Sequence, residues 1–150
     1  ISSPGINDMA VRFSKCCNPV PGDEIVGFVT RGRGMSIHRT DCVNVIKLSA
    51  AERSRLITAE WEDPGDTEEG GQYLAELKLY ADDRRGLLLD VSKVFTEEKI
   101  DVKSMNTRTS KKGTATMEMG FVVHGREELN RVIGKLRQIE NVIDIERTTG

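Results

Sequence analysis

The feature that most constrains the fold is a hydrophobic period that switches repeatedly between strand-like and helix-like spacing in the second half of the chain. Apolar residues recur at every second position over residues 73–81, which is typical of a strand with one buried face, and at helical spacing over residues 86–98. The predicted segments are strand 73–81, helix 86–98, strand 100–109, strand 114–124, helix 126–139 and strand 141–147. This is the order of the ferredoxin-like βαββαβ fold. We therefore expect an antiparallel sheet with both helices on one face; another α+β meander with the same order is the alternative.

A stretch without any apolar residue separates this half from the rest. Residues 62–71 contain one proline, three glycines and five acidic residues, which is typical of a solvated linker. A long loop inside a single domain is the alternative, but structureless loops of this length are uncommon in compact domains. We therefore expect a front module at residues 11–61, an acidic linker at 62–71 and a second module at 72–149.

The front module is predicted to be a small α+β unit, with strands at 24–30, 35–39 and 55–61 and a helix at 41–51. A core built from about 50 residues is marginal, and small domains often add a metal or a disulfide. The chain has three cysteines, and an odd number fits a disulfide framework poorly. Reduced thiols that bind a metal are therefore the favoured use.

Candidate metal ligands are available in this module. Three sulfurs and one imidazole form a permissible closed tetrahedral zinc shell, and the residues that offer them are Cys16, Cys17, His38 and Cys42. Two prolines and a glycine follow directly at positions 19, 21 and 22, and they restrict the backbone to a tight knuckle. The sequence therefore predicts a zinc site, with Asp41 as a reserve oxygen ligand.

The cysteines and the histidine have two alternative interpretations. Cys16 and Cys17 are adjacent, and adjacent side chains of an extended backbone point to opposite sides, so both reach one metal only if the backbone is kinked. Three buried thiols beside a hydrogen-bonded histidine are an equally good interpretation from residue types alone. A nucleophilic Cys–His site would need a base and a cleft, which so small a module is not expected to form.

Composition excludes several classes of protein. There are 22 basic and 24 acidic residues, so the chain is not a bulk polycation that coats nucleic acid, although a local basic patch is compatible with this charge. No apolar run approaches the roughly 18 residues that span a bilayer, and the first residues do not resemble a signal peptide. Ile1 stands where an initiator methionine would. We expect a cytoplasmic protein without membrane contact that is part of a longer or processed chain.

Two motifs resemble a known family. Residues 16–42, CCNPVPGDEIVGFVTRGRGMSIHRTDC, closely resemble the zinc-finger-like, ribosome-intersubunit module near the carboxy end of long RelA/SpoT-type stringent-response proteins. Those enzymes make and degrade guanosine tetra- and pentaphosphate. Residues 83–88, DRRGLL, resemble the ACT domain that follows this module in the same family. The resemblance implies an α+β chain with a zinc-finger-like α+β module followed by a ferredoxin-like ACT domain.

The resemblance also implies a function. The chain would be the non-catalytic regulatory region of a bifunctional synthetase/hydrolase, while its parent would be a GTP pyrophosphokinase or (p)ppGpp hydrolase. In this family the region contacts the ribosome, its rRNA and a stalled deacylated tRNA, self-associates and restrains the catalytic domains. The family's cysteine, histidine and aspartate positions map onto Cys16, Cys17, His38, Asp41 and Cys42, so zinc binding by these residues is a hypothesis that the resemblance supports. An amino-acid-binding ACT dimer that regulates another metabolic enzyme is the alternative.

A basic hairpin is the candidate RNA contact. Arginines bind phosphate in a bidentate manner, and glycines allow close approach of the backbone. The residues concerned are Lys15, Arg31, Arg33 and Arg39, with glycines at 32 and 34. Aromatic residues are few, so we expect recognition of RNA shape and backbone rather than base stacking. A solvated hairpin tip with ordinary surface arginines is the alternative.

The turn between the first strand and the first helix of the second module is the candidate ligand site. ACT domains bind a small ligand, often an amino acid, beside this turn, where helix-start amides can receive a carboxylate. The predicted site residues are Asp83, Arg84, Arg85, Gly86, Leu87, Met105 and Asn106. A purely structural turn is an equal alternative, and Arg84 and Arg85 are also candidate RNA contacts.

Overall fold

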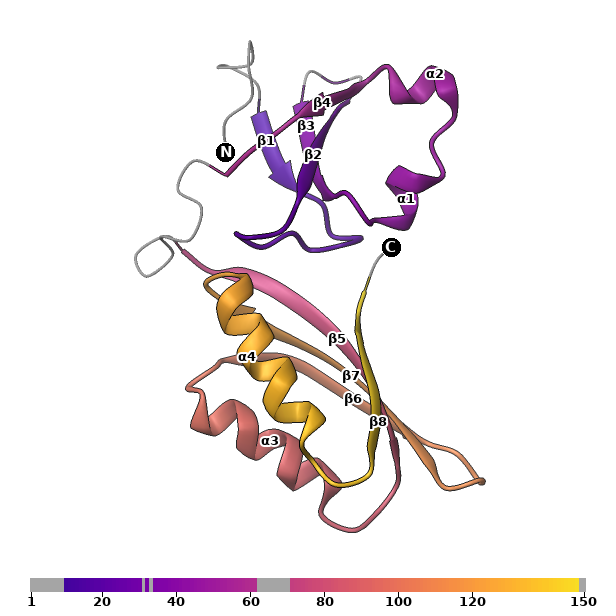
Figure 1. The fold of residues 1–150 in the computed structure, drawn as a ribbon, viewed down its shortest axis with the longest axis vertical. Helices are drawn as coiled ribbons and strands as arrows, with labels where there is room; N and C mark the ends of the chain where they lie inside the picture. The colour runs from indigo at the N-terminus through magenta and orange to yellow at the C-terminus, as the bar shows by residue number, and fades with distance from the viewer. Residues whose placement is uncertain (1–9, 31, 33, 62–70, 149–150) are drawn as a thin grey trace.

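The structure is a computed structural model that describes residues 10–30, 32, 34–61 and 71–148, and it contains two modules that contact each other (Figure 1). The front module consists of β1 (Ala10–Phe13), β2 (Ile25–Val29), β3 (Gly34–Arg39), α1 (Val43–Ile46), α2 (Ala50–Arg53) and β4 (Leu56–Thr58). The second module consists of β5 (Tyr73–Asp82), α3 (Leu87–Glu97), β6 (Val102–Thr109), β7 (Thr114–Val123), α4 (Arg126–Arg137) and β8 (Val142–Arg147).

The second module has the fold that the periodicity predicts. Its sheet has the order β6-β7-β5-β8, and every neighbouring pair of strands is antiparallel. Helices α3 and α4 both lie on one side of this sheet (Figure 1). This arrangement confirms the ferredoxin-like prediction. The helices cover the sheet face on which the alternating apolar residues of β5 and β7 lie.

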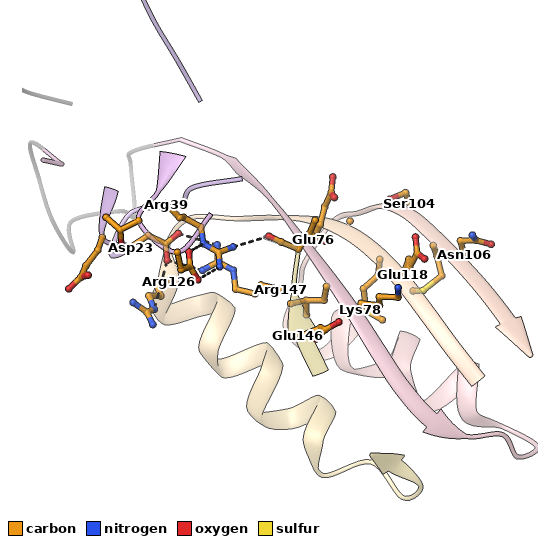
Figure 2. Close-up of a pocket in the computed structure, with 18 residues that line it drawn as sticks. Asp23, Arg39, Glu76, Lys78, Ser104, Asn106, Glu118, Arg126, Glu146 and Arg147 are labelled. Atoms are coloured by element: carbon orange, nitrogen blue, oxygen red, sulfur yellow. Dashed lines mark hydrogen bonds and ion pairs between the residues drawn. The ribbon is translucent and has the colours of Figure 1, made fainter. Parts of the chain in front are cut away.

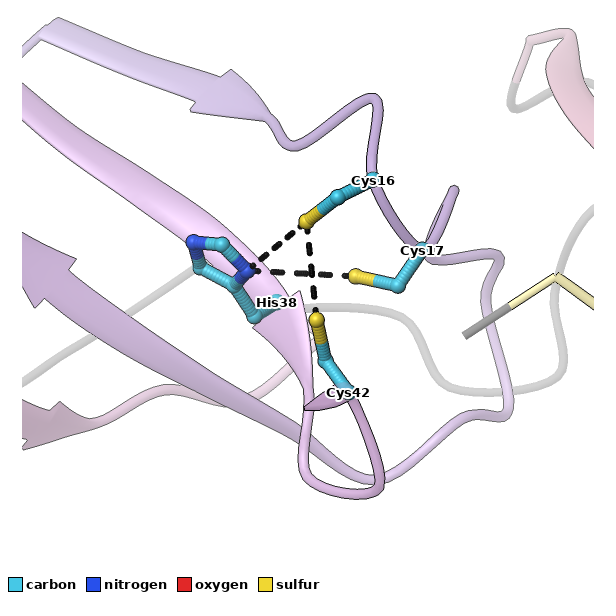
Figure 3. Close-up of side chains that lie close together, drawn as sticks. All are labelled: Cys16, Cys17, His38 and Cys42. Carbon is cyan, nitrogen blue, oxygen red and sulfur yellow. Dashed lines mark hydrogen bonds between the residues drawn. The ribbon is translucent and has the colours of Figure 1, made fainter. Parts of the chain in front are cut away.

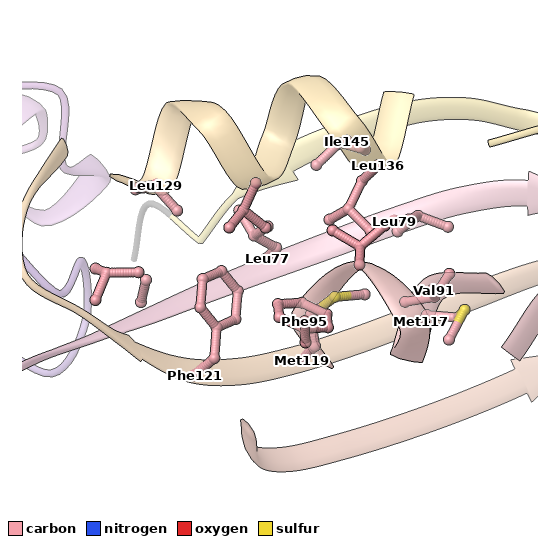
Figure 4. Packing of buried hydrophobic residues seen from close by; sticks show 14 of the residues in the cluster. Leu77, Leu79, Val91, Phe95, Met117, Met119, Phe121, Leu129, Leu136 and Ile145 are labelled. Atoms are coloured by element: carbon pink, nitrogen blue, oxygen red, sulfur yellow. The ribbon is translucent and has the colours of Figure 1, made fainter. Parts of the chain in front are cut away.

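The core of the second module lies between the sheet and the two helices (Figure 4). Phe95 of α3 packs against Phe121 of β7 with ring centroids 4.8 Å apart. Leu129 and Leu136 of α4 are fully buried over the same sheet. Full burial of such a side chain contributes roughly 1.5–3 kcal/mol to stability, so this module has an ample apolar core.

The front module is built on a smaller sheet with the order β1-β3-β2-β4, in which β1 runs parallel to β3. The three expected strands are present as β2, β3 and β4, whereas β1 was not expected because its segment is short. The single helix expected at 41–51 is wrong. The chain forms α1 and α2 instead, because Ser49 and Glu52 make a capping box that starts a new helix.

The segment between the modules is only partly described. Residues 62–70 lie outside the described residues, so the acidic linker at 62–71 and the module boundaries stay predictions. None of the helices in the described part of the chain combines the length and the apolar character that crossing a membrane requires.

Candidate metal centre

The backbone kink that a shared metal site requires is present after β1. The amide of Asn18 donates to the carbonyl of Ser14 at 3.0 Å, and Asn18 adopts a positive φ of 49°. This turn directs the side chains of Cys16 and Cys17 to the same side. The kinked arrangement, which the sequence left open, is therefore the one observed.

The four candidate ligands converge on one point (Figure 3). His38 extends from β3, and Cys42 precedes α1. His38 Nδ1 lies 3.5 Å from the sulfur of Cys16 and 3.9 Å from that of Cys17, while the sulfurs of Cys16 and Cys42 are 3.5 Å apart. All four ligand atoms lie within 4.8 Å of one another, and all three cysteines are free.

This donor set fits zinc. Tetrahedral zinc with Zn–S bonds of about 2.3 Å places its ligand atoms roughly 3.5–3.8 Å apart, which is close to the observed spacings. Three sulfurs and one nitrogen also complete the four-coordinate shell. Such a closed shell stabilises a fold and leaves no position for a reacting water or substrate.

Polar atoms around the ligands fix their orientation. Ser36 Oγ lies 3.2 Å from His38 Nε2, on the side of the ring away from the sulfurs. A proton on Nε2 then faces the serine oxygen, and Nδ1 keeps its lone pair for the metal. Burial and the charge of Arg12 lower the pKa of His38, so the imidazole is neutral at pH 7.

The pKa values of the three thiols are shifted in different directions. Burial raises the pKa of the Cys17 thiol to about 12 and also raises the pKa of Cys42. Burial acts in the same direction on Cys16, but hydrogen bonds, the strongest from Ser14 at 2.9 Å, outweigh it and lower its pKa. Because a bound metal needs thiolates, zinc binding must release protons.

Asp41 is not part of the centre, which corrects its assignment as a reserve ligand. Its carboxylate oxygens receive Arg39 Nε at 2.9 Å and Arg39 Nη2 at 2.7 Å. This bidentate ion pair lowers the pKa of Asp41 mainly through the hydrogen bond from Arg39. The carboxylate is thus committed to the arginine rather than to the sulfur cluster.

The predicted RNA-contact residues are separated by the structure. Arg39 is 5% exposed and its guanidinium is occupied by internal partners, so its assignment to an RNA surface is wrong. Lys15 is exposed beside the metal centre. Arg31 and Arg33 lie outside the described residues, and their RNA contact stays a prediction.

The predicted ligand site of the second module is not one cleft. Arg84 pairs with Asp90 at 2.6 Å, and Gly86 has a φ of 81° at the start of α3. Leu87 is buried in the core. Met105 and Asn106 line a groove of about 1120 Å³ whose described lining includes no residue of the 83–87 turn. The groove lies between the open face of the sheet and the front module (Figure 2).

Sequence reasoning missed several residues around the centre. Ser36 had a usable signal, because it precedes His38 by two positions in a strand and therefore shares its face. Arg147 had none, since it binds Asp23 across 124 positions of sequence. Contacts over such separations leave no local pattern.

Comparisons with known proteins agree with this architecture. The RelA/SpoT RIS domain matches residues 1–62 and an ACT domain matches residues 69–147. A GTP pyrophosphokinase of Escherichia coli (strain K12) is 37% identical over 147 residues, which cover 97% of this chain and 19% of that protein. A GTP pyrophosphokinase of Streptomyces coelicolor is 38% identical over 145 residues, which cover 97% and 16%.

A solved structure is also similar. The crystal structure of the ACT domain from GTP pyrophosphokinase of Chlorobium tepidum covers 51% of this chain and 99% of that one, with 21% identity and a TM-score of 0.47. The chain spans about a fifth of the length of the curated relatives it matches. Both domain matches occur in the order of the two observed modules, and the chain therefore belongs to the RelA/SpoT family, in whose C-terminal region a RIS domain is followed by an ACT domain.

Proposed function

We propose that this chain is the non-catalytic regulatory region of a guanosine tetra/pentaphosphate synthetase/hydrolase of the stringent response, and that its RIS module contacts ribosomal RNA. The observation that carries this proposal is the match of the RIS domain to the module that holds the Cys/His centre, together with similarity to GTP pyrophosphokinases through both modules. With a ribosomal partner, the chain would act in the cytoplasm.

The charge distribution supports an RNA partner for the RIS module. Residues 10–61 carry eight Lys/Arg residues and five Asp/Glu residues, although the whole chain has a net charge of −2. Nucleic-acid backbones bind such local positive surfaces through phosphate contacts. Arg12 and Lys15 are exposed on the same module. The RIS module is thus the more suitable half for RNA.

The metal centre supports a structural role within this function. Zinc would be held by Cys16, Cys17, His38 and Cys42, and it would tie three separate segments of the RIS module together. Because four protein ligands would fill the shell, a bound metal would stabilise the module and leave no position for a reacting water or substrate. Metal analysis of freshly purified chain should find about one zinc per chain; absence of zinc together with unchanged folding in chelator would reject the site.

The remaining parts of the proposal follow from family membership. They are self-association as a homodimer, contact with stalled tRNA, control of the catalytic domains of the parent enzyme, and amino-acid sensing by the ACT module. The start of α3 offers backbone amides to a ligand carboxylate, although Arg84 is already paired. Calorimetric titration with branched-chain amino acids tests the sensing part.

Co-sedimentation with ribosomes tests the main proposal. Wild-type chain should pellet with ribosomes, and the double variant Arg31→Glu with Arg33→Glu should bind more weakly. Loss of two phosphate contacts should also reduce the slope of log affinity against log salt by about 2. The matched control is Lys111→Glu with Lys112→Glu, which reverses two charges at the β6–β7 turn of the ACT module.

The outcomes separate the competing functions. If the arginine variant and the lysine control bind equally well, the hairpin is not the RNA contact. If wild-type chain does not pellet with ribosomes but gives heat with branched-chain amino acids, the chain is an amino-acid-responsive ACT regulator of another enzyme. Activity that depends on a free thiol would instead indicate a Cys-dependent enzyme.

A further inference from the structure

The two modules meet at the segment that carries two of the four metal ligands. We call residues 16–23 the knuckle. Val20 is fully buried and belongs to the hydrophobic core of the ACT module rather than to the RIS core. The carbonyl of Pro21 accepts the amide of Arg126, at the start of α4, at 2.7 Å. The knuckle therefore binds the metal on one side and packs on the ACT module on the other.

Arg147, the last residue of β8, is the main polar contact from the ACT module to the knuckle. Its guanidinium donates to the two carboxylate oxygens of Asp23 at 2.8 and 3.0 Å (Figure 2). It also donates to the carbonyl of Asn18 at 3.2 Å. The Asp23 side chain is 4% exposed and that of Arg147 is 15% exposed. Removing either partner of such a desolvated, bidentate pair leaves the other charge buried without a counter-ion, which strongly destabilises the contact.

Arg39 of the RIS module makes the reciprocal contact. Its backbone amide donates to the sulfur of Cys17 at 3.3 Å, and its Nη1 donates to the carbonyl of Cys17 and to the carbonyl of Thr148, each at 3.1 Å. Arginines from both modules thus cross the boundary and contact the knuckle, and Arg126 adds a longer ion pair to Asp23 at 3.9 Å. Arg39 also follows the ligand His38 directly, so the contact is continuous with the metal centre.

The backbone of the knuckle turns sharply at Asn18. This residue lies between the cysteine pair and Val20 with a φ of 49°, a left-handed conformation that asparagine adopts more readily than most residues other than glycine. The surrounding contacts add to this local preference and fix the direction of the Asn18 carbonyl. A bound metal would act on Cys16 and Cys17, and Arg147 acts on the carbonyl of Asn18 directly after them.

We propose that Arg147 is a positioning residue for the metal centre, so that metal binding by the RIS module and docking of the ACT module strengthen each other through the knuckle. The inference rests on the zinc site of the proposed function. Coupling between two binding events is reciprocal: if docking of the ACT module, which Arg147 stabilises, raises the affinity of the centre for zinc, then zinc must favour docking by the same factor.

The chain contains its own reporter of docking. Trp61, the one tryptophan of the sequence, donates Nε1 to the carbonyl of Asp23 at 3.0 Å. Its ring stacks on Phe13 with centroids 5.6 Å apart and meets Tyr73 of the ACT module edge to face at 5.8 Å. Undocking would expose this ring to water and shift its fluorescence emission to longer wavelength.

The experiment compares zinc binding by three proteins: wild-type chain, Arg147→Gln and the control Arg131→Gln. Arg131 is an exposed arginine of α4 that pairs with Glu98, away from the knuckle. Zinc affinity is measured by competition with a chromophoric chelator, and Trp61 emission is recorded during zinc titration of the metal-free proteins. Arg147→Gln should lower zinc affinity by about 10-fold and reduce the emission shift at saturating zinc, whereas Arg131→Gln should behave as wild type.

Conservative replacement separates positioning from general folding. Arg147→Lys keeps the charge but cannot form the bidentate contact, so it should recover only part of the zinc affinity. Circular dichroism confirms that each variant is folded. Should Arg147→Gln fail to fold, the titration of wild-type chain and Arg147→Lys still tests the coupling.

The possible negative results distinguish failure of the coupling from failure of the zinc site. Equal zinc affinities in all variants, or zinc binding by wild-type chain without any change in Trp61 emission, would overturn the coupling and leave the zinc site intact. A wild-type chain that binds no zinc would overturn both the zinc site and the coupling.

Discussion

Two serines contact the side chains of the candidate metal centre. Ser36 faces the ring nitrogen of His38 that points away from the sulfurs, and Ser14 contacts the sulfur of Cys16. Neither serine is a ligand. Each nevertheless selects a proton position or a side-chain rotamer, and outer partners of this kind affect metal affinity through the ligands they orient.

Replacing Ser36 with alanine should therefore weaken zinc binding without unfolding the chain. The hydroxyl that receives the Nε2 proton is lost, so the tautomer with a free Nδ1 becomes less favoured. We expect a loss of affinity on the order of 10-fold, measured by chelator competition. Ser54→Ala, which removes an exposed hydroxyl bonded to Ala51, is the matched control; equal affinities in both variants would contradict this role for Ser36.

Gly22 is a second residue on which the arrangement depends. Its φ is 106°, and a Cβ at this position would lie 2.7 Å from Arg126 Cβ. Gly22→Ala should cost about 1–2 kcal/mol for the left-handed backbone and about 1–3 kcal/mol more for crowding. Gly113→Ala shares the positive φ but meets open space, so it isolates the backbone cost. Urea unfolding at a fixed zinc concentration measures the loss of stability in each variant. Equal losses in the two variants would show that crowding against Arg126 adds no cost at Gly22.

At the scale of elements, α3 and α4 are joined at their exposed edges by one carboxylate. Glu98, which caps the end of α3, receives Arg131 Nε at 3.2 Å and Lys135 Nζ at 3.3 Å from α4. The hydrogen bond from Lys135 is the largest influence, and with that from Arg131 it lowers the pKa of Glu98. The two helices thus share a charge contact above the apolar core.

This contact predicts a pH dependence of stability. Because the folded-state pKa of Glu98 is lower than its unfolded value, the contribution is present above roughly pH 4.3 and is lost as pH falls through the folded-state pKa. Glu98→Gln should therefore be less stable than wild type at pH 7, and the difference should disappear in strong acid. Urea unfolding across this range tests it, with Glu97→Gln as control; a difference independent of pH would exclude the carboxylate as its source.

At the scale of the whole molecule, the two modules differ in what holds them together. The ACT module has one large apolar cluster, which lies between its sheet and its two helices. The RIS module has two small clusters, and one of them is made largely of the ligand cysteines themselves. Its small core is supported by its contact with the ACT module, and a metal bound by the cysteines would add to its stability.

Metal removal should consequently affect the modules unequally. In zinc-loaded chain, amide hydrogen exchange should be slowest in β5 and β7, which are the central strands of the ACT sheet. A chelator should accelerate exchange in β2 and β3 of the RIS module several-fold and leave β5 and β7 nearly unchanged. Uniform acceleration through the whole chain would show that the ACT module has no independent stability.

The sequence by itself determined the ACT fold and pointed to the four residues that the structure brings together as candidate metal ligands. Alternation such as that of Leu77 and Leu79 reports directly which strand face is buried, since strand and helix periods are local properties of the chain. Sulfur and imidazole are donors that zinc prefers, and this preference alone selected the candidate ligands Cys16, Cys17, His38 and Cys42. Periodicity along the chain and the chemical type of a side chain can both be identified from the sequence without a structure.

Only the tertiary structure decided where the long-range polar contacts go. Arg39 looked like an RNA contact and Asp41 like a ligand, but folding pairs them with each other and brings Arg39 to Thr148, 109 positions away. Arg147 and Asp23 meet across 124 positions. An arginine has the same side chain on a surface and in a buried ion pair, and the difference is set by desolvation and by partners that only the folded chain brings together.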